Sequence, residues 1–290
     1  MRATDRDDSG RRVRQAAITI AVLWVSACAP APVATSDATA VCARAWFCDS
    51  FEDDTVGELP SAPWQEETYR SGAVIEVTRD RAFTGTQSLR VYTPKGAPRR
   101  GYVAIHSAPV FPAADHEMYG RAMIWLDAAP QSLTDSTVHW TLLQGEGRSA
   151  DDRYNSIYRL GAELQGALGL KANFETTPPV RTDCRQHSAS TLPTNQWTCV
   201  EWHMSVAKNE MQFWLDGREL SDIHIRERGA AADSHCAHQE DLQGRWLAPP
   251  RFQSLYIGLE RYEDTVNDQH LWIDDVAVSD GRVGCPVQKK

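Results

Sequence analysis

Alternation of apolar and polar residues with a period of two constrains this chain more than any other feature. From Trp46 onward nearly every periodic segment shows it, and Gly, Pro, Asn or Asp bounds each segment. Short strands separated by turn residues predict an all-β fold, a sandwich of two antiparallel sheets. The expected strands are 74–78, 87–92, 102–106, 121–126, 138–143, 157–161, 168–175, 199–206, 211–215, 255–262 and 271–278.

The number of strands favours one domain. About eleven strands over roughly 240 residues indicate a single jelly roll rather than two domains. The 290 residues are 42% hydrophobic and 24% charged, which also suits one globular domain. The stretch 226–250 lacks alternation, so we expect a long loop held by Cys236. The formal net charge of −9 argues against a broad basic surface, so no nucleic-acid partner is expected.

The N-terminal segment indicates export. Five Arg residues precede an apolar stretch, 16–25, that ends in Ser26-Ala27-Cys28. This pattern predicts a secretory signal peptide, residues 1–27, and not a membrane span. The residues before Cys28 resemble a bacterial lipobox, so we expect cleavage before Cys28 and a lipid on its thiol. An ordinary signal peptide cut near Ala27 or Ala31 is the alternative.

Residues 28–45 are expected to be a flexible tether, because 29–41 are rich in Ala, Pro, Ser and Thr. Residues 46–286 then form the β domain. Loss of five Arg and three Asp with residues 1–27 moves the formal charge from −9 to −11. We expect a monomer anchored to the bacterial cell envelope, or otherwise secreted, that meets the membrane only through its lipid.

The cysteine count suits an oxidising compartment. An even number remains if Cys28 carries a lipid, which favours three disulfides among fifteen possible pairings. The sequence His235-Cys236-Ala237-His238 has no second Cys/His pair at zinc-site spacing, so a loop disulfide is favoured over zinc. The six cysteines are Cys42, Cys48, Cys184, Cys199, Cys236 and Cys285.

Polar side chains share one face of several expected strands. In 168–175 the apolar residues alternate with Lys171, Asn173 and Glu175, which must share the opposite face. If these strands lie in one sheet, its polar face suits a sugar polymer. Ordinary solvated positions on an antiparallel sheet are the alternative. The other polar residues at such positions are His139, Thr141, Arg159, Tyr256, Glu260 and Tyr262.

Short motifs carry a family resemblance over 47–285. Residues 48–52 (Cys-Asp-Ser-Phe-Glu), 83–89 (Phe-Thr-Gly-Thr-Gln-Ser-Leu) and 272–276 (Trp-Ile-Asp-Asp-Val) resemble the concanavalin-A-like jelly rolls of polysaccharide-active proteins. Residues 197–203, 213–217 and 282–285 are similar to the family of the cellulose-induced secreted protein of wood-degrading fungi and its bacterial relatives. That family in turn resembles glucuronan and alginate lyases.

The resemblance implies a structural calcium ion that joins the two ends of the domain. Its ligands would be the carboxylate of Glu52, the carbonyl of Thr84 and the carboxylate of Asp274. Carboxylates and turn carbonyls supply the hard oxygen ligands that Ca²⁺ requires. The alternative is that Glu52 and Asp274 are acids of a turn and a strand end.

The resemblance also implies a cleft that contains His139, Arg159, Glu260 and Tyr262. A uronate lyase must neutralise a carboxylate, for which the planar fork of Arg159 is suited. His139 or Tyr262 would take the proton at C5, and Tyr262 would return one to the leaving oxygen.

Other cleft positions depend on the same resemblance. Lys171 and Asn173 would help to hold the acidic sugar. The lyase pattern has a Gln a few residues after its Arg, where this chain offers Glu163 or Gln165. A carboxylate at that position would repel a uronate.

The relatives also have counterparts of Cys199 and Cys285, so the resemblance implies this disulfide first. It leaves Cys42 to pair with Cys48, and Cys184 with Cys236.

Three functions follow from these observations. The first is a lyase that acts on a uronate-containing polysaccharide, and the second is a carbohydrate-binding lipoprotein without catalysis. A glycoside hydrolase is less favoured, because no Glu-x-Asp-x-x-Glu run places paired carboxyl groups on a strand.

Overall fold

The computed structural model describes residues 41–70, 72–134, 137–164, 168–226, 235–237 and 250–286. The expected signal peptide, the lipidated Cys28, most of the tether and Gln165 lie outside these residues. Within them the all-β prediction is confirmed. Two 3-10 helices, Ala114–His116 and Ser221–Ile223, complete the assigned elements. No helix in the described ranges is long and apolar enough to cross a membrane.

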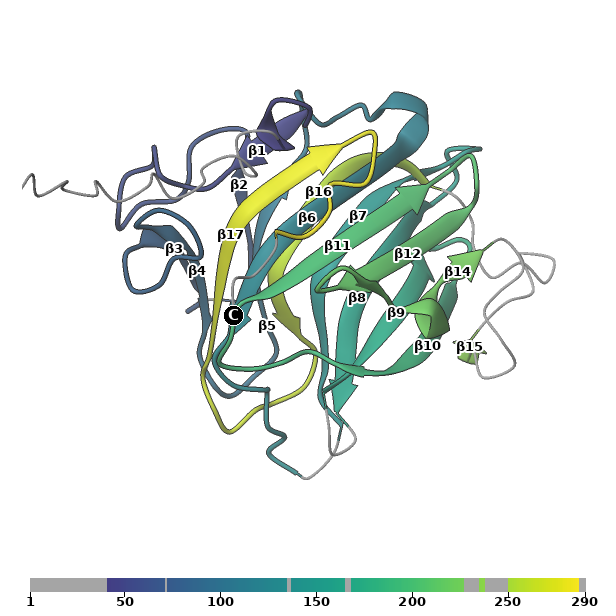
Figure 1. Ribbon diagram of the computed structural model, residues 1–290. Coiled ribbons are helices and arrows are strands. Elements are labelled where there is room, and N and C mark those ends of the chain that lie inside the picture. Colours follow the sequence, from purple (N-terminus) through teal and green to yellow (C-terminus); the bar gives the residue numbers. More distant parts are fainter. Residues whose placement is uncertain are drawn as a thin grey trace, which may run out of the picture. The chain divides into compact units, whose positions relative to one another are not determined.

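One of the two antiparallel sheets contains nine strands (Figure 1). The order along it is β13-β12-β11-β6-β17-β4-β3, with β1 paired to β17 and β14 paired to β12. Its strands are β1 (Phe47–Asp49), β3 (Val74–Thr78), β4 (Ser88–Thr93), β6 (Glu117–Leu126), β11 (Thr198–Ser205), β12 (Glu210–Leu215), β13 (Arg218–Glu219), β14 (Ile225–Arg226) and β17 (Gln269–Ser279).

The second sheet contains eight strands in the order β15-β10-β9-β8-β7-β16-β5-β2. These strands are β2 (Gln65–Tyr69), β5 (Arg99–Ile105), β7 (His139–Ser149), β8 (Asn155–Leu164), β9 (Leu168–Thr176), β10 (Thr182–Thr191), β15 (His235–Ala237) and β16 (Pro250–Arg261). Its strands β7, β8, β10 and β16 have 10 to 12 residues each, which gives the candidate site below a broad support.

The apolar faces of the two sheets pack against each other in one core. Trp140 and Phe174 of the eight-stranded sheet belong to the same buried cluster as Trp202 and Ile273 of the nine-stranded sheet. Gly120 permits this packing, because a Cβ there would lie 2.1 Å from the Cζ2 atom of Trp202. Alternation along each strand then turns the polar positions away from the core.

The structure contains six strands that the sequence analysis did not predict, namely β1, β2, β10, β13, β14 and β15. The alternation did not reveal β10, because several of its outward and inward residues alike are polar or small. The range 226–250, expected as a loop, contributes the end of β14, the whole of β15 and the start of β16. Within the range expected to be a long loop held by Cys236, the three residues His235–Ala237 are therefore a strand paired with β10.

Disulfides tie both ends of the domain to its body. Cys42 is bonded to Cys48, and Cys285 near the C-terminus is bonded to Cys199 of β11. Cys184 of β10 is also disulfide-bonded, and its cross-strand neighbour on β15 is Cys236. The side chain of Cys236 lies outside the described residues, so the Cys184–Cys236 pairing stays a prediction.

Candidate functional site

A groove opens on the polar face of the eight-stranded sheet. Its volume is about 360 Å³, near the lower end of the usual size range of small-molecule sites. The side chains that line it are His139, Thr141, Arg159, Lys171, Asn173, Glu175, Asp183, Arg185 and Tyr262.

The strand register explains why these residues meet. One row across the sheet pairs Arg185 with Asn173, and Arg159 with both Asn173 and Gln144. Residues opposite each other on paired strands point to the same face. The register therefore places these polar side chains on one face of the sheet, as the alternation predicted. The neighbouring row contains, in order, His187, Lys171, Gly161, Thr141 and Glu260.

The guanidinium of Arg159 lies at the middle of the groove. Its Nε donates to Oε1 of Gln144 over 2.8 Å, and its Nη1 donates to Oδ1 of Asn173 over 3.1 Å and to Glu175. Burial alone would lower the pKa of Arg159, but the nearby Tyr262 and Glu175 raise it overall. Arg159 is therefore a fixed cation, held in place from two sides.

Gln144, which contacts Arg159 of the groove, is a residue that the sequence analysis missed. Its side chain is 5% exposed, and its Nε2 donates to Oε2 of Glu146 over 2.9 Å. The amide that accompanies Arg159 thus comes from the neighbouring strand, β7, and not from the residues that follow Arg159 in the chain. Only strand pairing brings the two together, so no local motif signals it.

The imidazole of His139 lies between two carboxylates. Its Nδ1 is 2.5 Å from Oε1 of Glu263, and the backbone N–H of His139 donates to Oε2 of the same residue over 2.6 Å. Its Nε2 lies 3.1 Å from Oε1 of Glu163 but makes no hydrogen bond to a described residue. Glu263 therefore orients the ring, and Nε2 is buried beside Oε1 of Glu163.

Glu163 is surrounded by basic groups. Its Oε2 accepts hydrogen bonds from Nε2 of His187 over 2.9 Å and from Nζ of Lys171 over 3.3 Å. Burial opposes its charge, but the hydrogen bond from His187 and the charges of Lys171 and His139 lower the pKa of Glu163 to about 2. Burial also lowers the pKa of Lys171. The Lys171 ammonium is thus committed to Glu163 within the protein.

Tyr262 follows β16 and reaches the groove with its hydroxyl. The hydroxyl is 3.1 Å from Oγ1 of Thr141 and donates to Oε2 of Glu260 over 3.1 Å. The residue as a whole is 41% exposed, but its hydroxyl oxygen lies against Thr141 and Glu260. Burial raises the pKa of Tyr262 to about 12. Tyr262 is therefore a neutral phenol near neutral pH.

Glu260 does not face the groove as a free acid. It is 6% exposed and forms an ion pair with Arg100, whose Nη2 lies 2.8 Å from its Oε1. Its Oε2 also accepts from the hydroxyl of Tyr102 over 3.3 Å. Glu260 consequently acts as support beneath Tyr262.

The groove wall formed by β10 was absent from the sequence prediction. Asp183 and Arg185 line it, and Nη2 of Arg185 lies 3.2 Å from Oδ2 of Asp183. The amide of Asn173 donates to Oδ1 of Asp183 over 2.7 Å, so its nitrogen is turned toward β10. These residues escaped notice because β10 lacks the apolar alternation that marks a strand.

The residues proposed as calcium ligands meet at the 83–87 turn, on which Thr84 lies and to which Glu52 and Asp274 are hydrogen-bonded. Oε1 of Glu52 accepts from the backbone N–H groups of Thr86 and Gln87 over 2.7 and 2.8 Å. Oδ2 of Asp274 accepts from the N–H of Thr84 over 3.2 Å. Gly85 has a φ of +61°, and a Cβ there would lie 2.3 Å from Oε1 of Glu52. Both carboxylates thus reach the 83–87 turn from opposite ends of the chain.

Asp274 and Asp275 form a buried acidic pair beside this turn. They are 0% and 5% exposed, and no salt bridge among the described residues engages either. Burial and the charge of Asp275 raise the pKa of Asp274 to about 7. The hydroxyl of Thr84 donates to Oδ1 of Asp275 over 2.7 Å. Buried carboxylates outside any salt bridge of the described residues are a donor set that fits a hard cation, although the charge of Arg121 also acts on both.

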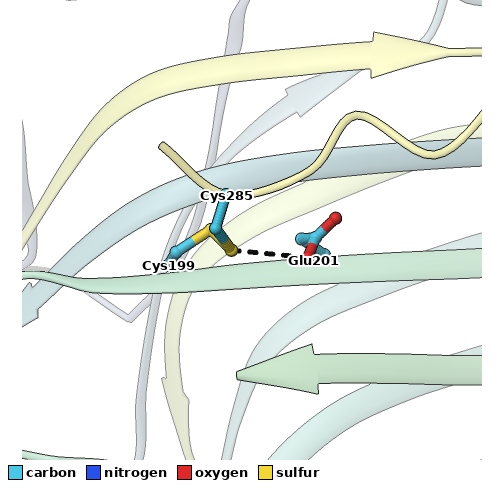
Figure 2. A group of neighbouring side chains, drawn as sticks. All are labelled: Cys199, Glu201 and Cys285. Carbon is cyan, nitrogen blue, oxygen red and sulfur yellow. Dashed lines mark hydrogen bonds between the residues drawn. A yellow bond between two sulfur atoms is a disulfide. The ribbon is translucent and has the colours of Figure 1, made fainter. Parts of the chain in front are cut away.

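Cys199, Glu201 and Cys285 are the one group with metal-ligand proximity among the described residues (Figure 2). Both sulfurs are bound in a disulfide and offer no thiolate. The carboxylate of Glu201 accepts from Nη2 of Arg282 over 2.8 Å and from the N–H of Gly284 over 2.9 Å. This group therefore anchors the C-terminal segment and does not fit a metal.

The two sheets and the groove define the class of protein as a jelly-roll sandwich in which one sheet has a polar face. The family model described as polysaccharide lyase-like, Cip1-like core domain, matches residues 50–281. This chain belongs to that family. No match was found among curated protein sequences.

Solved structures share the fold. The cellulose-induced protein Cip1 is 20% identical with a TM-score of 0.56, and the comparison covers 83% of this chain and 100% of that chain. An endo-β-1,4-glucuronan lyase from the fungus Trichoderma reesei is 12% identical with a TM-score of 0.51, covering 82% and 96%. A PL-14 alginate lyase from Aplysia kurodai is 10% identical with a TM-score of 0.47, covering 81% and 98%. At these identities the first two similarities, with TM-scores above 0.5, show the fold alone.

Proposed function

We propose that this protein binds a uronate-containing polysaccharide in the groove and cleaves it by β-elimination. The observation that carries the proposal is the convergence of His139, Arg159 and Tyr262 on one groove. Membership of a polysaccharide lyase-like family and the shared fold with a glucuronan lyase support it. A fold by itself does not define an activity, so the chemistry of these three side chains must support the proposed reaction.

Arg159 and Gln144 are suited to receive the carboxylate of the sugar. A guanidinium that pairs with a carboxylate reduces its negative charge, which makes the proton on the adjacent C5 more acidic. Both side chains are already oriented by their own contact, so little ordering is required when a ligand binds. Glu175 must leave Arg159 for this to happen, and its side chain is 41% exposed.

His139 and Tyr262 have complementary states for the two proton transfers. Nε2 of His139 is the base that takes the C5 proton once it separates from Oε1 of Glu163, which lies 3.1 Å away. The electron pair of the C–H bond forms the C4–C5 double bond as the C4–O4 bond breaks. Tyr262, with a pKa raised to about 12, holds the proton that the leaving oxygen receives.

The test is the unsaturated sugar end that β-elimination creates, followed by its ultraviolet absorbance over a broad panel of uronans. We expect product with the natural protein and at least about a 100-fold loss of rate in Arg159→Ala. Arg218→Ala is the matched control, because Arg218 is an exposed residue of β13 remote from the groove lining. Absence of product from every uronan would reject the lyase proposal.

A second candidate is carbohydrate binding without cleavage. It is favoured by the contacts that engage the reactive groups, namely Arg159 with Glu175 and His139 with two glutamates. Isothermal titration calorimetry distinguishes the candidates, since this one gives heat of binding with no unsaturated product. A glycan panel without any binding rejects it.

We also propose a structural calcium ion at the 83–87 turn, held by Glu52 and Asp274. When bound, the ion would neutralise acids that no described salt bridge neutralises.

We also propose, from the N-terminal sequence, that the protein is exported with a lipid on Cys28. Metabolic labelling with a fatty acid tests it, and a Cys28→Ala variant that keeps the label would contradict it.

A further inference from the structure

The basic residues that line the groove already have acidic partners. Each of its three Lys and Arg residues forms an ion pair within the protein: Arg159 with Glu175, Lys171 with Glu163, and Arg185 with Asp183. A groove built for a polyanion instead presents unpaired cations along its length. The charge arrangement here therefore restricts how many acidic groups a ligand can place in the groove.

The three pairs differ in how easily a ligand can replace the acid. The side chains of Glu175 and Asp183 are 41% and 44% exposed, so either can turn into solvent. The side chain of Glu163 is only 12% exposed and is held from β7, β9 and β10 by His139, Lys171 and His187. A ligand carboxylate can thus exchange with Glu175 at Arg159, but it cannot displace Glu163.

Glu163 lies on the same strand face as Arg159, four residues further along β8. At about 3.3 Å per residue this separation is roughly 13 Å, toward the end of the groove that His139 marks. A second carboxylate on the same ligand would approach Glu163 there, and Glu263 on the other side of His139. Like charges brought together in this way disfavour such a ligand.

We infer that the groove accepts a glycan in which an acidic sugar is flanked by neutral sugars, and that Glu163 is the residue that rejects a second acid. This inference rests on the proposed function, because it takes Arg159 as the receptor of the single carboxylate. The neutral neighbours would meet the hydroxyl and amide groups of Thr141, Tyr262 and Asn173, which hydrogen-bond without regard to charge.

Calorimetry with two hexasaccharides tests the inference. One probe is an oligomer of glucuronate only, and the other contains a single glucuronate flanked on both sides by N-acetylglucosamine. For the natural protein we expect at least tenfold tighter binding of the single-acid probe. Glu163→Gln removes the charge and keeps the shape of the side chain, so it should tighten binding of the all-glucuronate probe at least tenfold and change the single-acid probe less than threefold.

Glu58→Gln is the matched control, since Glu58 is exposed and lies on a loop away from the groove. Equal affinity of the natural protein for both probes overturns the inference without any variant, and leaves the proposed function standing. An unchanged preference in a folded Glu163→Gln protein also overturns the inference and leaves the proposed function standing. If neither probe binds the natural protein or the variant, the proposed function and the inference fail together.

Discussion

Glu163 illustrates how much a single groove residue depends on its neighbours. Its pKa is about 2 in the folded protein against 4.5 for an isolated glutamate. A folded pKa below the unfolded value means that the charge stabilises the fold fully above pH 4.5, and that this stabilisation is lost as the pH falls toward 2. The shift corresponds to at most about 3 kcal/mol.

We therefore predict that acid destabilises the natural protein more steeply than Glu163→Gln. Urea unfolding at a series of pH values between 5 and 2 would measure the difference in slope. Glu58→Gln should retain the slope of the natural protein, because the Glu58 side chain is exposed and lies away from the basic groups around Glu163. Parallel curves for the natural protein and Glu163→Gln would show that the basic groups around Glu163 do not stabilise its charge.

At the scale of elements, the C-terminal segment depends on β11 for its place. Glu201 is 1% exposed and accepts from Arg282 and from the N–H of Gly284, next to the Cys199–Cys285 disulfide (Figure 2). The guanidinium of Arg282 also lies 4.5 Å from the ring centre of Trp214 on β12. The segment is thus fixed by a covalent bond, an ion pair and a ring contact.

Arg282→Ala is predicted to destabilise the domain by about 3 kcal/mol, because it leaves the buried Glu201 carboxylate without its cation. Chemical denaturation under oxidising conditions measures this change while the disulfide stays closed. Arg218→Ala, which removes an exposed arginine of the neighbouring β13, should cost less than about 0.5 kcal/mol. Equal stability of the two variants would assign the anchoring to the disulfide alone.

For the whole molecule, the proposed calcium ion would join residues that are more than two hundred positions apart in the chain, Glu52 and Asp274. A ligand that binds only the folded state at 100 times its dissociation constant adds about 2.7 kcal/mol of stability. For a domain of this size each kcal/mol corresponds to about 2–4 °C in Tm.

We predict that chelation with EDTA lowers Tm by about 5–10 °C, and that added Ca²⁺ restores it. Differential scanning calorimetry measures both steps. Glu52→Gln should start from the lower Tm and respond weakly to Ca²⁺, whereas Glu58→Gln should respond like the natural protein. A Tm that EDTA leaves unchanged would argue for a turn stabilised by hydrogen bonds alone.

Several elements were predictable because their signal is local. Val74–Thr78 agrees at both ends with the expected strand, and β9 and β12 differ by a single residue at one end. In these strands each inward residue is apolar, so alternation marks them directly. In β10 and β2 polar residues occupy both faces, and hydrogen bonding to a neighbouring strand stabilises what local preference does not.

The candidate site was also predictable where the signal of its residues is local. His139, Arg159, Lys171, Asn173 and Tyr262 lie at polar positions of alternating strands, and the structure gathers them in one groove. Gln144, Glu263 and the residues of β10 were missed, because their importance depends on which strand lies beside which.

The sequence by itself determined that this chain forms two-sided strands with one apolar face each, since side-chain direction along a strand depends only on the order of residues. It also determined which polar side chains are available on the other face. Tertiary structure alone decided that Gln144 lies against Arg159 and that Glu163 lies among three basic groups. Register and strand order set those neighbours, and both result from packing of the whole sandwich and not from any local pattern.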